Sequence, residues 1–100
     1  PDTVTRVART FCDIVESQIP SMVTAIENRN LESLRCESHK IKGGAGTLTA
    51  ARLPEAARLL ETCCEQHNLA QLTAAMNELI AEFGRFKEYV QEHIQCVAGR

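Results

Sequence analysis

One short segment combines a nucleophilic side chain, two cations and several residues with little or no side chain. It reads His39-Lys40-Ile41-Lys42-Gly43-Gly44-Ala45-Gly46. An imidazole with an ordinary pKa of about 6.5 is partly neutral, and so nucleophilic, at physiological pH. A lysine held nearby can stabilise the negative charge that spreads over a phosphoryl group during its transfer. The segment therefore indicates an imidazole that accepts a phosphoryl group.

The glycines of this segment need an explanation, because each costs a helix about 1 kcal/mol relative to alanine. On a helix, Lys42 and Gly43 lie three and four residues after His39 and so share its face, and Gly46 follows one turn later. The apolar residues of the same predicted helix lie on another side: Leu34, Ile41 and Ala45. The pattern predicts an exposed imidazole beside an ammonium group and a strip that another protein can approach closely.

Apolar residues spaced three and four apart predict helices throughout the chain. The first line is Val4, Val7, Phe11, Ile14, Met22 and Ile26, and Pro20 interrupts it, so we expect two helices or one kinked helix there. Further helices are predicted over about 31–46, 52–67 and from 69 to about 97, with Asn30 and Asn68 as caps. The predicted fold is an all-α, antiparallel up-and-down four-helix bundle with an additional short N-terminal helix.

Composition narrows the class of protein. The chain has 100 residues, a formal net charge of −2 and five cysteines without a C-x-x-C pair. We interpret residues 1–100 as one domain, and we expect it to be excised from a longer protein because no Met precedes Pro1. No basic stripe and no apolar run of about 20 residues is present, so we expect no nucleic acid and no membrane contact by this domain. The odd cysteine count and the missing C-x-x-C pair favour the cytoplasm.

The order His39-x-x-Lys42-Gly43, followed by Gly46, resembles the signature of histidine-containing phosphotransfer (HPt) domains. The likeness continues through Leu48, Leu53, Ala57, Leu60 and Glu61 and covers roughly residues 2 to 97. Many members carry Gly where this chain has Thr49, so the turn after the helix of His39 is expected to differ slightly.

The resemblance implies roles for individual residues. His39 would carry the phosphoryl group at Nε2, Lys42 would stabilise that group, and Glu61 would accept a hydrogen bond from Nδ1 of His39. Gly43 and Gly46 would give a partner room, and we add Arg35 to the expected docking surface, which should have an exposed apolar centre near His39.

The resemblance also implies the partners. These would be response-regulator receiver domains, one donating the phosphoryl group from an Asp and another accepting it on an Asp. Mg²⁺ would belong to the receiver, and we expect this chain to bind no cofactor or metal and to be a monomer in isolation. It would be a phosphohistidine carrier without a nucleotide site of its own. The resemblance also implies that the domain is part of a longer sensor histidine kinase, at the cytoplasmic end of an inner-membrane protein.

The sequence also leaves alternative functions to consider. The chain could be the N-terminal phosphoacceptor domain of a chemotaxis-type histidine kinase, phosphorylated directly by an ATP-binding domain, or an inert helical interaction module. A Walker loop needs G-x-x-x-x-G-K-[ST] after a strand, and the order here is different. Cys36 and His39 supply only two ligands, too few for a zinc site.

Overall fold

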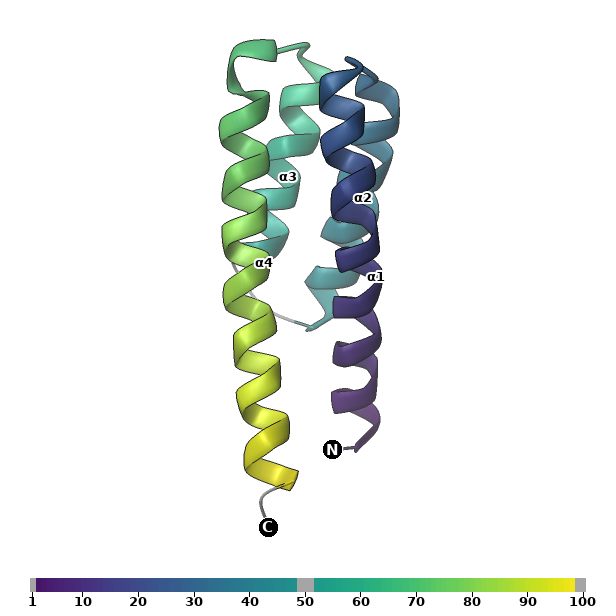
Figure 1. The fold of residues 1–100 in the computed structure, drawn as a ribbon. Coiled ribbons are helices and arrows are strands. Elements are labelled where there is room, and N and C mark those ends of the chain that lie inside the picture. Colours follow the sequence, from purple (N-terminus) through teal and green to yellow (C-terminus); the bar gives the residue numbers. More distant parts are fainter. Residues whose placement is uncertain (1, 49–51, 99–100) are drawn as a thin grey trace.

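Four helices form an antiparallel bundle (Figure 1). The computed structural model describes the backbone of residues 2–48 and 52–98, and the side chains of these residues except 2, 4 and 93–98. The helices are α1 (Asp2–Glu27), α2 (Leu31–Leu48), α3 (Arg52–Glu65) and α4 (Leu69–Ala98). Within the described ranges there is no strand, and the predicted all-α four-helix bundle is confirmed.

Each helix packs against two neighbours, so that the four form a closed ring in the order of the chain. The bundle measures 49 × 22 × 19 Å, and α1 and α4 extend beyond α2 and α3 at the end where both termini lie (Figure 1). α2 and α3 pack against each other. Side chains from these two helices can therefore meet on one surface.

The buried faces of α2, α3 and α4 follow the predicted apolar spacing. The fully buried core side chains include Leu34 and Ile41 of α2, Leu60 of α3 and Leu79 of α4. Ser38 lies inside the α2 stripe and is also fully buried, and its hydroxyl donates to the carbonyl of Leu34. α2 and α3 are thus each fixed in rotation by their core residues.

The separate short N-terminal helix was a wrong prediction, because α1 continues through Pro20 without a break. A proline removes one backbone hydrogen bond and crowds the preceding turn, which costs a helix about 3 kcal/mol. Pro20 and Glu16, whose carbonyl loses its partner, both lie on the exposed side of α1. Val15 before the proline and Met22 after it are fully buried, so packing on both sides keeps one helix.

The predicted apolar line of α1 was also partly wrong. Val7 and Ile14 are 49% and 52% exposed, whereas the core takes Ala8, Cys12 and Val15 instead. These smaller residues occupy the face of α1 that meets its neighbours. Over residues 7–15 the buried line therefore runs one residue later than the predicted one, whereas Met22 is buried as predicted.

The two described turns end α1 and α3 in the same way. Arg29 and His67 have φ values of 57° and 54°, and the amide of the following Asn donates to a carbonyl five residues earlier in each case. The side chain of Asn30 accepts from the amide of Ser33 at 3.2 Å, which confirms the predicted cap. α3 ends at Glu65, two residues before the predicted end, and Thr49 lies outside the described residues.

Candidate functional site

His39 lies on the side of α2 that faces away from the core, as the spacing predicted. Its side chain is 63% exposed, and its Nδ1 lies 2.9 Å from Oε2 of Glu61 on α3. An ionised carboxylate can only accept a hydrogen bond, so this contact requires the proton on Nδ1. In the neutral ring, Nε2 then keeps its lone pair, which is the form of imidazole that can attack phosphorus.

Glu61 lies at the edge of the buried face of α3 and is only 7% exposed. Its second oxygen, Oε1, accepts from Nζ of Lys42 at 2.9 Å, so each carboxylate oxygen has a partner from α2. Hydrogen bonding from Lys42, with a smaller contribution from His39, holds the pKa of Glu61 below its ordinary value, although burial acts in the opposite direction. Glu61 is therefore a fixed negative charge beneath the imidazole.

The ion pair between Lys42 and Glu61 was not predicted, because its two members are nineteen residues apart and lie on different helices. The resemblance assigned Lys42 to the phosphoryl group alone. In the structure the ammonium group is bound to Glu61 and its side chain is 35% exposed. Lys42 is thus anchored within the site while part of it remains open to a group that approaches His39.

The glycines of α2 divide into two kinds. A Cβ atom built on Gly43 or Gly46 would meet nothing within 4 Å, whereas one on Gly44 would lie 2.7 Å from the Phe11 ring of α1. That ring also makes an edge-to-face contact with Phe86 of α4, with centroids 5.9 Å apart. Gly44 therefore serves helix packing, and only Gly43 and Gly46 leave an open surface beside His39.

The surface around His39 is charged rather than apolar, which corrects the expected apolar centre. Among the described residues, no large hydrophobic side chain is exposed on α2. One is exposed on α3, Leu59, but it is two residues from Glu61 and so lies on another side of the helix. Arg35 precedes His39 by one turn and pairs with Glu32 at 2.8 Å. Arg58 precedes Glu61 by three residues and pairs with Glu55, its Nε lying 3.0 Å from Oε1.

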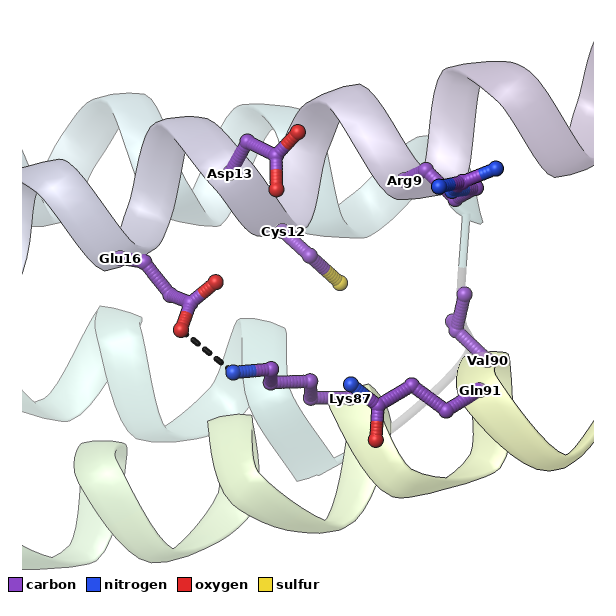
Figure 2. A pocket seen from close by; sticks show the side chains of 7 residues that line it. All are labelled: Arg9, Cys12, Asp13, Glu16, Lys87, Val90 and Gln91. Atoms are coloured by element: carbon purple, nitrogen blue, oxygen red, sulfur yellow. Dashed lines mark hydrogen bonds and ion pairs between the residues drawn. The ribbon is translucent and has the colours of Figure 1, made fainter.

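A hollow of the described surface lies elsewhere, between α1 and α4 (Figure 2). It is an open groove of about 450 Å³, with Cys12 and Val90 among its lining residues and an ion pair between Lys87 and Glu16 across it. It contains no residue of the His39 site. Among the described residues, no three His, Cys, Asp or Glu side chains gather to hold a metal ion, and no described helix is long and apolar enough to cross a membrane.

The geometry of His39, Lys42 and Glu61 suits acceptance of a phosphoryl group. Bond formation from Nε2 to phosphorus leaves positive charge on the ring, and the carboxylate at Nδ1 stabilises that charge. The proton on Nδ1 is shared with Glu61 and need not leave. The neighbouring ammonium and the open positions at Gly43 and Gly46 leave the approach to Nε2 accessible.

Comparison with protein-family models matches residues 6–95 to the family described as Hpt domain. The matched range contains every residue of the site described above. No curated protein matches the chain. No solved structure matches it either.

Proposed function

The chain belongs to the Hpt domain family, which gives it a phosphotransfer role in a phosphorelay, and on that premise we propose that His39 is its phosphoacceptor. In this proposal the chain accepts a phosphoryl group from the Asp of one receiver domain and passes it to the Asp of another. The observation that carries the proposal is the buried carboxylate of Glu61 on Nδ1 of an exposed imidazole.

The first step forms an N–P bond at Nε2 of His39 and breaks the P–O bond of the aspartyl phosphate. The Asp leaves as a carboxylate, and Nδ1 keeps its proton, which stays hydrogen-bonded to Glu61. The second step is the reverse, with a new Asp carboxylate attacking the phosphorus and the ring leaving with its lone pair restored at Nε2. Mg²⁺ in the receiver would stabilise the charge on the phosphoryl oxygens, and this chain would contribute Lys42.

Reversible transfer needs a site that stabilises both free and phosphorylated histidine. Lys42 supports this, because its ammonium can stay on Glu61 before transfer and turn to the phosphoryl oxygens afterwards. The site has no nucleotide-binding element in this proposal, and donor and acceptor both come from partners. The docking surface includes Gly43, Gly46 and Arg35.

Phosphotransfer from a phosphorylated receiver domain tests the proposal. Wild-type chain should gain an acid-labile, alkali-stable label, and His39→Gln should gain none. The matched control is His67→Asn, because His67 is exposed and in a backbone conformation that Asn tolerates. Label on His39→Gln, or loss of label in His67→Asn, would contradict the assignment of His39.

A further inference from the structure

The Glu–Arg pairs beside His39 share one arrangement, although they lie on different helices. In each pair the Glu precedes the Arg by three residues, Glu32 before Arg35 on α2 and Glu55 before Arg58 on α3. Each guanidinium uses Nε and Nη2 toward its own Glu, and in Arg35 the same Nη2 also contacts the thiol of Cys36. Among the described residues, Nη1 of both arginines therefore has no hydrogen-bond partner.

The two arginines lie at opposite ends of the His39 site. α2 and α3 are antiparallel, so Arg35, one turn before His39, lies toward one end of the bundle, and Arg58, one turn before Glu61, lies toward the other. The ion pair between Lys42 and Glu61 joins the two helices at the site. The side chain of Arg35 is 33% exposed and that of Arg58 50% exposed, so both can be reached from outside.

A guanidinium group whose Nη1 has no partner still offers N–H donors to a carboxylate, with which it forms charge-assisted hydrogen bonds. A long side chain that is already held in place also loses less freedom when a partner binds. No exposed large hydrophobic side chain of the described residues lies on α2 to provide an apolar alternative. The recognition chemistry on both sides of His39 is therefore ionic.

We propose that Arg35 and Arg58 form a two-point clamp that selects receiver domains with carboxylates on both sides of their phosphorylated Asp. The proposal rests on the function proposed above and adds how the partner is chosen. The free Nη1 edges take the partner's carboxylates, while Glu32 and Glu55 keep the guanidinium groups oriented. Specificity then depends on the distance between two charges, and association should weaken as salt rises.

Binding and transfer are measured with a receiver domain that phosphorylates the wild-type chain, for Arg35→Glu, Arg58→Glu and the control Arg6→Glu. Arg6 is exposed on α1, which is not a neighbour of α3, so its reversal changes net charge equally without touching the clamp. Each clamp variant should raise the Kd by about 10-fold or more at 50 mM salt, with the difference shrinking at 500 mM, and the Arg6 control should bind as wild type does.

Direct labelling with phosphoramidate separates the clamp from the chemistry. This small donor needs no docking, so clamp variants should be labelled on His39 at the wild-type rate. If the clamp variants bind the receiver as tightly as Arg6→Glu does, or lose affinity equally at both salt concentrations, the clamp is wrong while His39 can still be the acceptor. If phosphoramidate does not label His39 in the wild-type chain, the proposed function is wrong. The Kd values then still show, independently, whether the clamp binds the receiver.

Discussion

Removal of the Glu61 carboxylate is the most direct perturbation of the site. The residue accepts from His39 and Lys42 at 2.9 Å each and is 7% exposed, so both contacts lie in a partly desolvated place. We compare Glu61→Gln, which keeps an acceptor for Nδ1 but loses the charge, with Glu61→Ala, which loses both. Glu88→Ala is the control, because Glu88 is exposed on α4.

The expected magnitudes follow from the strength of hydrogen bonds. A bond to a charged group contributes roughly 1.5–3 kcal/mol, and a neutral one about 1 kcal/mol. Glu61→Ala should therefore cost the transfer step about 2 kcal/mol, or roughly 30-fold in rate, since each 1.36 kcal/mol is tenfold. Glu61→Gln should cost about 1 kcal/mol, or roughly fivefold.

The assay is transfer of label from a phosphorylated receiver under single-turnover conditions. A second readout is the ¹⁵N spectrum of His39, which reports the nitrogen that carries the proton. In wild type the neutral ring should be protonated at Nδ1, and in Glu61→Ala the Nε2–H form should grow. A role of Glu61 limited to holding α3 against α2 would slow transfer without changing this ratio.

Two results would refute the reasoning. One is a Glu61→Ala protein that folds, transfers at the wild-type rate and keeps the proton on Nδ1. The other is an equal loss in Glu61→Ala and Glu88→Ala, which would place the effect in the general charge of the surface. Either result would leave His39 without the orienting carboxylate that the geometry indicates.

Three further predictions concern the glycines, Glu61 and the cysteines. Gly43→Ala should raise the melting temperature, since the new Cβ would meet nothing within 4 Å and alanine favours a helix by about 1 kcal/mol. Gly44→Ala should lower the melting temperature, because its Cβ would lie 2.7 Å from the Phe11 ring, and equal shifts for the two variants would contradict these contacts. The folded-state pKa of Glu61 lies below its ordinary value of 4.5. The stabilisation from its contacts should therefore be complete above pH 4.5 and disappear as the pH falls through the pKa of the folded state. A carboxyl ¹³C titration of Glu61 with a midpoint at or above 4.5 would contradict this. Burial raises the pKa of the Cys64 thiol to about 11, so iodoacetamide at pH 8 should modify the half-exposed Cys36 well before Cys64, as mass spectrometry of the native protein can show.

The sequence predicted the helices of the site well because their core residues repeat clearly. The apolar line of α2 and that of α3 are buried as expected, and the spacing placed His39, Lys42 and Gly43 on one exposed face. α1 was harder to predict, because small residues rather than Val7 and Ile14 fill the contact with its neighbours. Periodicity alone gives two adjacent lines similar weight, and only the neighbouring helices decide between them.

The spacing of residues along the chain could not predict the contacts between helices. Gly43 and Gly44 are adjacent and identical in type, yet only Gly44 touches Phe11, thirty-three residues earlier. The Lys42–Glu61 ion pair likewise depends on how α2 and α3 are placed side by side. Only a general argument was available from the sequence. A carboxylate at the edge of the core needs a cationic partner, and a lysine one turn from the histidine can supply it.

The core and the chemistry of this protein are linked through the rotation of α3. Leu60 is fully buried and Cys64 nearly so, and they lie on either side of Glu61 in the chain. Their burial fixes the rotation that holds the Glu61 carboxylate at the seam with α2 rather than in solvent. Since Glu61 binds both His39 and Lys42, the positions of these two side chains depend on the same core contacts. A core substitution that lets α3 turn should therefore impair phosphotransfer before it unfolds the bundle.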